Sequence, residues 1–156
     1  MNKQDKYMER AVELSIESVA TGGGPFGAVI VRNGEVVAEA SNSVTQDNDP
    51  TAHAEVNAIR EACKTLDTFV LDDCEIYCSC EPCPMCLGAI YWSRFKAIYF
   101  ANTKEDAQAI DFSDRFIYEE IDRPYVARHI KTERINHPGA IQAFKDWANS
   151  EVKRKY

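Results

Sequence analysis

The sequence predicts a three-layer α/β domain in which helices flank a mixed β-sheet. An apolar pattern with helical spacing opens the chain, a β-hairpin signal follows it, and helix-like and strand-like segments then alternate. The chain has 156 residues, the usual size of one domain, and no linker, repeat or low-complexity stretch divides it. We therefore expect a single domain over residues 1–156.

The first predicted elements are a helix over residues 5–21 and a hairpin over residues 26–40. Apolar side chains at helical spacing are expected to form the buried face of the helix: Met8, Val12, Ile16 and Val19. Asn33-Gly34 divides the second segment into two strands, because a type I′ turn needs positive φ at both of its central residues.

Further helices and strands alternate along the chain. The predicted ranges are helices at 53–66 and 82–92 and strands at 75–78 and 96–101. Pro84 falls in the first turn of its helix, where proline is tolerated. The segment FIYEEI fits either a helix or a strand, and residues 138–153 predict a helix with Phe144 and Trp147 on one side.

Charge and composition narrow the class of protein. The formal net charge is -7, which does not favour a nucleic-acid partner, because proteins that grip phosphates usually carry a basic face. The N-terminal segment MNKQDKYMER lacks the apolar core of a signal peptide, and no apolar run approaches the ~20 residues of a membrane helix. We expect a cytoplasmic protein with no membrane partner. Clustered cysteines in that compartment favour metal binding or catalysis over disulfides.

Four of the six cysteines lie in the stretch CSCEPCPMC, residues 78–86. An iron–sulfur cluster of the bacterial ferredoxin type would need a further Cys-Pro, but position 90 is Ile. A structural four-cysteine zinc site usually joins two separated pairs, and four ligands so close together would crowd a tetrahedron. Neither kind of site is favoured.

Residues upstream complete a different metal pattern. His53 opens one predicted helix and Glu55 follows it, while Cys83 and Cys86 open another helix at i and i+3, on one face. His53, Cys83 and Cys86 predict a site for one Zn²⁺ per subunit with the fourth position open. H-x-E and P-C-x-x-C together are the signature of zinc nucleobase deaminases.

Glu55 is the expected catalytic acid and base. Two thiolate ligands reduce the acidity that zinc gives to a bound water, so a nearby base is needed. Glu55 would take the proton of the water, deliver it to a ring nitrogen and later protonate the leaving ammonia. The remaining cysteines are expected to be small packing residues: Cys63, Cys74, Cys78 and Cys80.

With these residues in view, the chain resembles the cytidine-deaminase-like superfamily and, within it, the small bacterial guanine deaminases. The resemblance covers nearly the whole chain, through GGPFGAVIV, DPTAHAEV, SCEPCPMCLGAIYW, FIYEEI and an aromatic final residue. It implies the three-layer α/β/α fold of that superfamily. It also implies hydrolysis of the C2 amino group of guanine, which yields xanthine and ammonia.

The resemblance further implies the substrate contacts, which are Phe26, Asn42, Ala54, Phe112, Asp114 and Tyr156. An aromatic pocket can stack a planar base, and Asn and Asp can read the donors and acceptors on its edge. Ordinary roles compete with these assignments: Phe26 could be a core residue, Asn42 a strand cap, Asp114 part of a solvated loop and Tyr156 a frayed end.

The resemblance implies a homodimer in which the C-terminal segment from about residue 138 is swapped between subunits. Tyr156 would then reach the pocket of the partner. The alternative is a monomer with a docked terminal helix.

Other functions stay open. Other deaminases of the same fold act on guanosine, cytosine, amino-triazines or tRNA adenosine. A tRNA enzyme needs a basic surface, and the segment NTKEDAQAIDFSD lacks the K-T-G-A-type stretch of that family. A zinc-stabilised protein without catalysis would usually lack the Glu of H-x-E, and Glu55 is present.

Overall fold

A computed structural model describes residues 2–156, which form two units, one ending at Phe116 and one spanning Ile117–Tyr156. The first unit contains α1 (Lys3–Ala20), β1 (Gly27–Arg32), β2 (Glu35–Ser41), α2 (Val44–Asp47), α3 (Ala54–Leu66), β3 (Cys74–Cys80), α4 (Pro84–Trp92), β4 (Ala97–Asn102) and α5 (Lys104–Gln108). The predicted helices and strands of this unit are all present. The short helices α2 and α5 were not predicted.

The sheet has the strand order β2-β1-β3-β4 and is mixed, as predicted. β1 pairs antiparallel with both β2 and β3, whereas β3 and β4 run parallel. Asn33 and Gly34 join β1 to β2 with φ values of 53° and 83°, which confirms the predicted turn.

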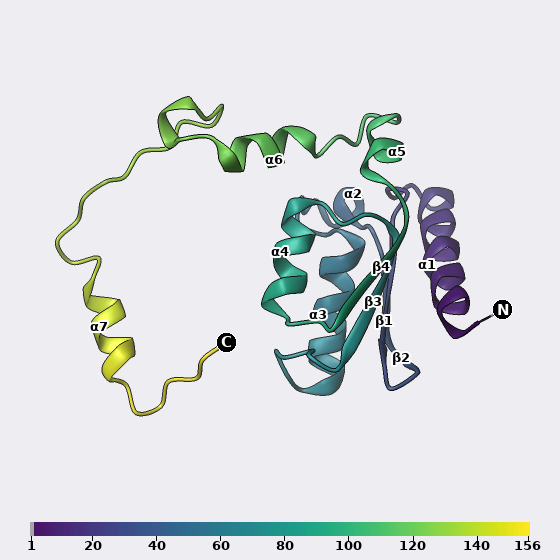
Figure 1. Cartoon of the computed structure of the whole chain (residues 1–156), viewed down its shortest axis with the longest axis horizontal. Helices are drawn as coiled ribbons and strands as arrows, with labels where there is room; N and C mark the ends of the chain where they lie inside the picture. Colours follow the sequence, from purple (N-terminus) through teal and green to yellow (C-terminus); the bar gives the residue numbers. More distant parts are fainter. Residues whose placement is uncertain (1) are drawn as a thin grey trace. The chain divides into compact units, whose positions relative to one another are not determined.

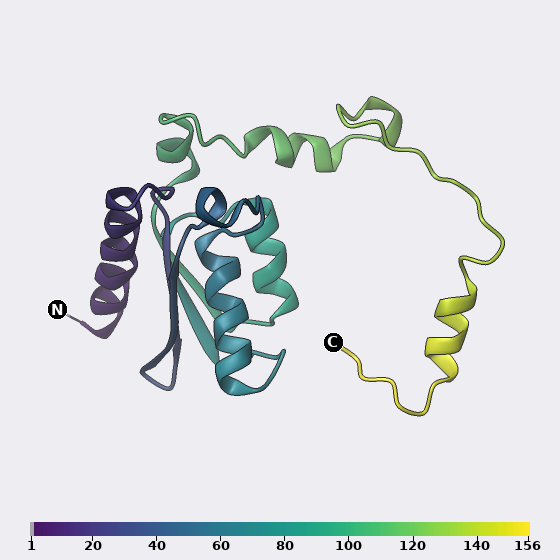
Figure 2. The same cartoon turned by 180° about the vertical axis from the view of Figure 1, so that it is seen from behind.

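Helices cover both faces of the sheet, α1 on one side and α3 with α4 on the other (Figures 1 and 2). Alternate side chains of β1 supply the two interior layers, because successive residues of a strand point to opposite faces. Val29 and Val31 pack with Tyr77 beneath α1. Ala28 and Ile30 belong to the larger core beneath α3 and α4.

The buried face of α1 differs from the predicted one. The helix buries Tyr7, Ala11, Leu14 and Ser18. Ile16 and Val19 are 64% and 55% exposed. The reason is the close approach of α1 to β1: a Cβ on Gly27 would lie 2.3 Å from the carbonyl oxygen of Ala11. Only small groups fit at that contact, so the face with Ala11 turns inward rather than the more apolar one.

Strand register brings several chain segments to one end of the sheet. Ala28 lies opposite Cys78, Gly27 opposite Ser41, and Cys80 opposite Asn102. The beginning of β1 and the ends of β2, β3 and β4 therefore meet. The residues that begin α3 and α4 follow β2 and β3 at this end, which is where the predicted site residues are expected to gather.

The second unit has little regular structure. It contains most of α6 (Arg115–Asp122), a 3-10 turn (Tyr125–Ala127) and α7 (Gln142–Asn149). FIYEEI is therefore helical, and the predicted helix over residues 138–153 is shorter at both ends. No residue from Ile117 to Tyr156 is buried. Among the residues that the structure describes, no helix is both long and apolar enough to cross a bilayer.

Candidate active site and metal centre

Three predicted metal ligands lie together where α3 and α4 begin. His53 is the N-cap of α3, and Cys83 is the N-cap of α4. His53 Nδ1 lies 3.5 Å from both Cys83 Sγ and Cys86 Sγ. Pro84 occupies the first turn of α4, where the backbone N–H has no acceptor within the helix. Its fixed φ favours a helix start here, and the helix places Cys83 and Cys86 on one face.

The spacing of these atoms suits a tetrahedral zinc ion. The three ligand atoms lie within 4.8 Å of one another. Zinc–nitrogen and zinc–sulfur bonds of about 2.0 and 2.3 Å at tetrahedral angles place nitrogen and sulfur about 3.5 Å apart. The observed 3.5 Å agrees with this spacing. Mixed imidazole and thiolate ligation is also typical of zinc.

The two thiols differ in acidity. The Cys86 thiol, the His53 ring and the Cys86 backbone N–H all bind the Cys83 sulfur and lower the pKa of Cys83 to about 4. The hydrogen bond to Cys83 and burial raise the pKa of Cys86. Zinc is bound by thiolates, so its binding releases the thiol protons of this pair.

Glu55 lies beside the ligand group, in the first turn of α3. Its Oε2 is 3.4 Å from Cys86 Sγ, and its side chain is 7% exposed. Burial raises the pKa of this carboxyl. A carboxyl group that is buried next to an open metal position can take a proton and return it, which is the role predicted from the sequence.

Asn42 is fixed by hydrogen bonds at three of its atoms. Its backbone N–H donates to Phe26 O at 3.1 Å, and its carbonyl accepts from Ser18 Oγ at 3.3 Å. Its side-chain Oδ1 accepts from the Val44 N–H at 3.2 Å. Asn42 is therefore a rigid residue at the end of β2, as a substrate contact should be.

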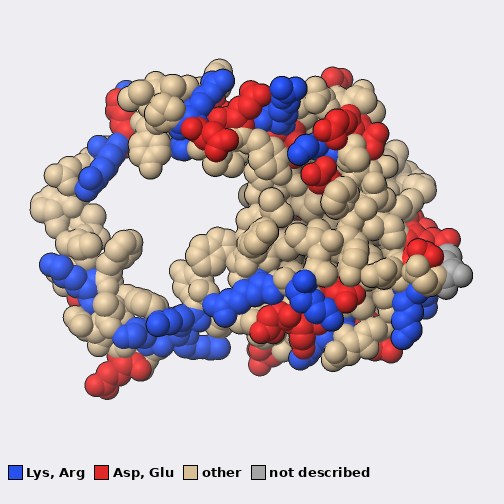
Figure 3. Space-filling model, in the orientation of Figure 1, with Lys and Arg blue, Asp and Glu red and all other residues tan. Residues whose placement is uncertain are grey.

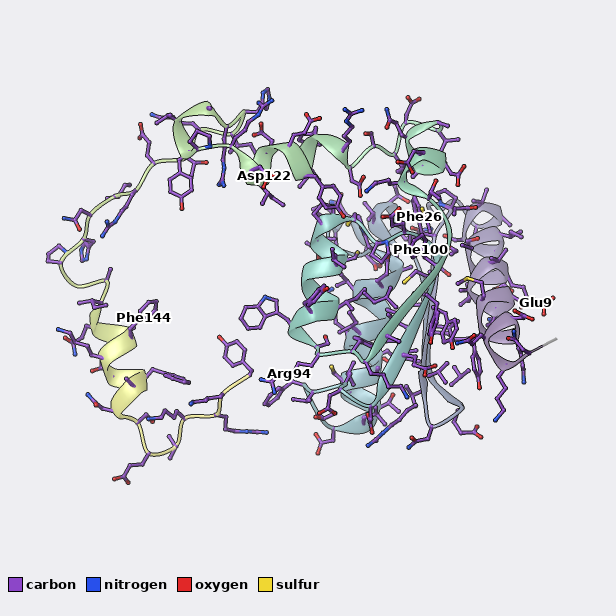
Figure 4. The ribbon with its side chains drawn as sticks, viewed as in Figure 1. Glu9, Phe26, Arg94, Phe100, Asp122 and Phe144 are labelled. Atoms are coloured by element: carbon purple, nitrogen blue, oxygen red, sulfur yellow. The ribbon has the colours of Figure 1, made fainter. Side chains whose placement is uncertain are left out.

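The aromatic pair Phe26 and Phe112 joins two segments far apart in the sequence. Their rings lie edge to face with centroids 5.2 Å apart. Phe26 precedes β1 at the site end of the sheet (Figure 4). Phe112 belongs to the loop after α5, which also carries Asp114. Burial raises the pKa of Asp114, and the charge of Cys83 raises it further, so this carboxyl lies near the metal centre.

Two predicted substrate contacts, Ala54 and Tyr156, have no side chain placed at the metal centre. Ala54 is the first residue of α3, and its methyl group is fully buried in the core. It can therefore face a substrate only through its backbone N–H, which is free at a helix start. Tyr156 belongs to the second unit and is 72% exposed. Its contact with a substrate stays a prediction.

Two supporting residues were not predicted. Asn57 donates its side-chain amide to Ser41 O at 3.0 Å and Ser43 Oγ at 2.9 Å, and so ties the turn around Asn42 to α3. Ser79 is 2% exposed and accepts from the Gly27 N–H at 2.9 Å. No spacing marks either residue, because each acts through a contact across the fold. The packing roles predicted for Cys74, Cys78 and Cys80 are confirmed, since all three are buried.

Comparison with known proteins places the chain in a family. The sequence profile described as the cytidine and deoxycytidylate deaminase zinc-binding region matches residues 1–102. The chain belongs to this deaminase family. The family is zinc-binding by its description, and the described residues of this deaminase offer one cluster of three potential ligands, made by His53, Cys83 and Cys86.

Relatives of this deaminase include enzymes on two kinds of substrate. Guanine deaminase of Bacillus subtilis is 52% identical over 153 residues, which cover 97% of this chain and 98% of that protein. A tRNA-specific adenosine deaminase of Aquifex aeolicus is 36% identical and covers 83% of each chain.

Solved structures agree with the fold. The X-ray structure of the Bacillus subtilis guanine deaminase has a TM-score of 0.97 at 52% identity and covers 100% of this chain and 99% of that one. A guanine deaminase from Nitrosomonas europaea has a TM-score of 0.67 at 34% identity, over 69% of this chain and 63% of that one. The cytidine-deaminase-like fold predicted from the sequence is thus confirmed.

Proposed function

We propose that this protein is a zinc-dependent guanine deaminase that hydrolyses guanine to xanthine and ammonia. Similarity at 52% identity, which covers 97% of the chain including the loop with Asp114 and the C-terminal segment, carries the choice of guanine. The ligand group with Glu55 beside it supports the hydrolytic chemistry. The reaction serves purine catabolism or salvage.

His53, Cys83 and Cys86 would hold the metal, and Glu55 would move the protons. Zinc, when bound, lowers the pKa of a coordinated water so that it can attack near neutral pH. Glu55 takes the proton of that water and delivers it to the ring nitrogen next to C2. After attack at C2, Glu55 would take the second water proton from the new C2 hydroxyl group and give it to the amino group, which leaves as ammonia while C2 becomes a carbonyl carbon. Burial of Glu55 keeps its carboxyl available for both directions of transfer.

Residues around the metal centre would orient the base. Phe26 and Phe112 offer aromatic surface for the purine plane. Asn42 presents its amide NH₂ group, because Val44 already occupies its Oδ1. Asp114 can accept hydrogen bonds from guanine N–H groups. A site with these polar groups would reject bases that leave them unpaired.

Adenosine in tRNA is the second candidate, because a tRNA-specific adenosine deaminase is 36% identical over 83% of the chain. Charge argues against it. The protein carries 25 acidic and 18 basic residues, whereas gripping an RNA backbone needs a basic surface.

Ammonia release from purified, zinc-loaded protein tests the proposal. Guanine is compared with guanosine, cytosine, adenine and an amino-triazine, and Glu55→Gln serves as the matched blank. We expect fast release from guanine only, and a fall of about 10³-fold or more in Glu55→Gln with zinc content unchanged.

Each outcome of this assay has a meaning. Release from another base but not from guanine would keep the deaminase class and overturn the substrate. Undiminished turnover by Glu55→Gln would remove Glu55 from the mechanism. Retained zinc without turnover of any amino-heterocycle would favour a binding protein.

We also propose a homodimer in which the C-terminal segment, from about residue 138, packs on the partner subunit and brings Tyr156 to its site. The amphipathic helix α7 supports this proposal, since Phe144 and Trp147 remain 73% and 44% exposed within their own chain. Figure 4 marks Phe144 on this helix. The first unit also exposes large side chains on α4, with Tyr91 at 73% and Trp92 at 69%. Apolar faces of this size on two separate units need a cover.

Charge supports the same arrangement. Residues 117–156 contain eight Lys and Arg against six Asp and Glu, and residues 1–116 contain ten against nineteen. Lys and Arg side chains are spread along the second unit (Figure 3). The second unit therefore suits an acidic partner surface, which the first unit of another copy provides.

Complementation between two inactive variants tests the exchange. Glu55→Gln lacks the catalytic carboxyl and keeps its C-terminus, whereas Tyr156→Ala keeps the carboxyl and lacks the aromatic end. Co-expression of the two should restore turnover, up to about a quarter of the wild-type sites in a random mixture of dimers. A tail that acts on its own subunit would restore none.

The cytoplasmic location predicted from the sequence is checked by cell fractionation.

A further inference from the structure

An ion pair at the end of β3 links the metal centre to helix α5. Glu81 stands between β3 and the ligand Cys83. Its Oε1 lies 3.6 Å from Lys104 Nζ, and its Oε2 accepts the Lys104 backbone N–H at 3.2 Å. The Glu81 backbone N–H donates to Asn102 O at 2.8 Å. One residue thus holds both the end of β4 and the first residue of α5.

Helix α5 connects the contact between Glu81 and Lys104 to the loop that contains Phe112. The Lys104 N–H has no acceptor inside α5, because it belongs to the first turn, and Glu81 supplies one from another element. Thr103 and Asp106 complete the helix start with reciprocal capping bonds. At the other end, the Phe112 N–H donates to Ala107 O at 3.0 Å. The Ala107 N–H donates to Thr103 O at 3.2 Å, so hydrogen bonds and the helix backbone together connect the Lys104 contact with Phe112.

The segment held in this way carries two of the substrate contacts. Phe112 packs its ring edge to face on Phe26, with centroids 5.2 Å apart. Asp114 follows two residues later, and the charges of Cys83, Lys104 and Glu81 all act on its carboxyl. Displacement of α5 would therefore move both contacts relative to the metal centre.

We infer that Glu81 is a positioning residue: through Lys104 it fixes α5 and so sets the places of Phe112 and Asp114 over the metal centre. The inference rests on the proposed function, which assigns these two residues to the substrate. Glu81 itself needs no contact with the base. Its loss should mainly weaken substrate binding, because the metal ligands and Glu55 are held by other elements.

A second ion pair at the opposite end of the same strand supplies a matched control. Glu75, near the start of β3, lies 3.3 Å from Lys96, just before β4. The side chains of Glu75 and Lys96 are 25% and 45% exposed, and those of Glu81 and Lys104 are 26% and 45% exposed. The two pairs lie at opposite ends of the β3–β4 strand pair with nearly equal burial, but only the pair of Glu81 and Lys104 adjoins the metal centre.

Steady-state kinetics on the zinc-loaded full-length enzyme compare Glu81→Ala and Glu81→Gln with Glu75→Ala and Glu75→Gln. We expect Glu81→Ala to lower kcat/KM for guanine about 10- to 100-fold, mostly through KM, since small misplacements at a site have effects of this size. Glu81→Gln keeps an oxygen for the Lys104 N–H and should recover part of the loss. Both Glu75 variants should stay within about two-fold of wild type.

Amide hydrogen exchange gives a readout that does not depend on turnover. Glu81→Ala removes the acceptor of the Lys104 N–H, and we expect exchange at Lys104 and Phe112 to accelerate about ten-fold or more. Glu75→Ala should leave both amides unchanged. Zinc content, measured in parallel, should stay at one ion per chain in all four variants.

These readouts separate the inference from the proposed function. Wild-type protein without guanine turnover would refute the proposed function, and exchange at Phe112 would still decide whether Glu81 holds the loop. Unchanged exchange at Phe112 in Glu81→Ala would overturn the inference. Equal kinetic losses in the Glu81 and Glu75 variants would also overturn it, because they would mark a general structural effect. If Glu81→Ala fails to fold, Glu81→Gln decides by kinetics: it loses the charge that pairs with Lys104, and a kcat/KM no lower than that of Glu75→Gln would overturn the inference.

Discussion

The two units of this chain are stabilised in different ways. The first unit buries side chains on both faces of its sheet, including Ile30, Ile76 and Tyr77 at 1% exposure or less. The second unit buries none of its residues. It contains local polar contacts, such as the Glu120–Arg123 pair at 2.9 Å.

This difference shows that only the first unit has a hydrophobic core of its own. Burial of apolar side chains is the main source of folding stability, and no side chain of the second unit is buried. Short helices such as α6 and α7 are marginal without a packed face. The zinc ligands, Glu55, Asn42 and Phe26 all belong to the unit with its own core. Tyr156 is the one predicted contact that lies in the other unit.

A chain that ends after Phe116 gives the largest expected effect. We expect it to keep its circular dichroism spectrum and one zinc per chain, because its core and ligands are all present. Turnover of guanine should fall about 100-fold or more, because the truncation removes the proposed Tyr156 contact and the proposed dimer contacts of the C-terminal segment. Size-exclusion chromatography and metal analysis check this. A truncated chain with full activity would refute the role of the C-terminal segment, and an unfolded one would show that the first unit depends on the second.

Matched truncations in the two units come next. Ile76→Ala removes a fully buried side chain, and we expect it to lower the free energy of unfolding by about 2–5 kcal/mol. Phe144→Ala removes a side chain that is 73% exposed within its own chain, so its effect should be smaller and should depend on protein concentration. Urea unfolding at two concentrations distinguishes them. A large effect of Phe144→Ala that ignores concentration would show that α7 packs within one chain.

Removal of one hydroxyl group from each unit compares how much a side-chain hydrogen bond stabilises the first and the second unit. Ser79→Ala leaves the buried Gly27 N–H without its acceptor, and we expect a loss of about 1–3 kcal/mol in the free energy of unfolding. Thr132 Oγ1 donates to Ile130 O at 2.9 Å on an exposed segment, and Thr132→Ala should change stability by less than about 0.5 kcal/mol. Thermal melts of both variants measure the difference. Equal shifts would contradict the contrast in burial.

The smallest effect concerns charge on the surface of the first unit. Arg10 binds Glu39 at 2.8 Å and lowers the pKa of that carboxyl below its ordinary 4.5. A lowered pKa means that this stabilisation is complete above about pH 4.5 and is lost as the pH falls through the folded-state pKa. Glu39→Gln should therefore cost about 0.2–1 kcal/mol at pH 7 and less at pH 3. Unfolding curves at both pH values check the sign, and a larger cost at pH 3 would contradict it.

Local signals in the sequence were sufficient for the hairpin turn and the candidate metal ligands of the first unit. Asn33-Gly34 marks the hairpin because both positions adopt positive φ, and the structure shows them at 53° and 83°. Each of the motifs H-x-E and P-C-x-x-C lies at the start of one helix. Spacing within each motif therefore predicts that the side chains of His53, Cys83 and Cys86 can bind a metal ion. The structure brings their ligand atoms within 4.8 Å.

Contacts between residues far apart in the chain could not be predicted from the sequence. Helical spacing cannot choose between two apolar faces of α1, and the approach to Gly27 decides in favour of the face with Ala11. The support that Asn57 and Ser79 give to the site is equally invisible, because their partners are distant in the chain.

The sequence by itself predicted the three candidate metal ligands that the structure brings together, the mixed three-layer fold, and Glu55 as the proposed catalytic carboxyl, because local spacing marks each helix start, turn and strand. Only the tertiary structure decided which face of α1 is buried, how Asn42 is oriented, and that Glu81 and Lys104 connect the metal centre to the loop with Phe112. The physical reason is that these features depend on strand register, which places residues far apart in the chain at hydrogen-bonding distance.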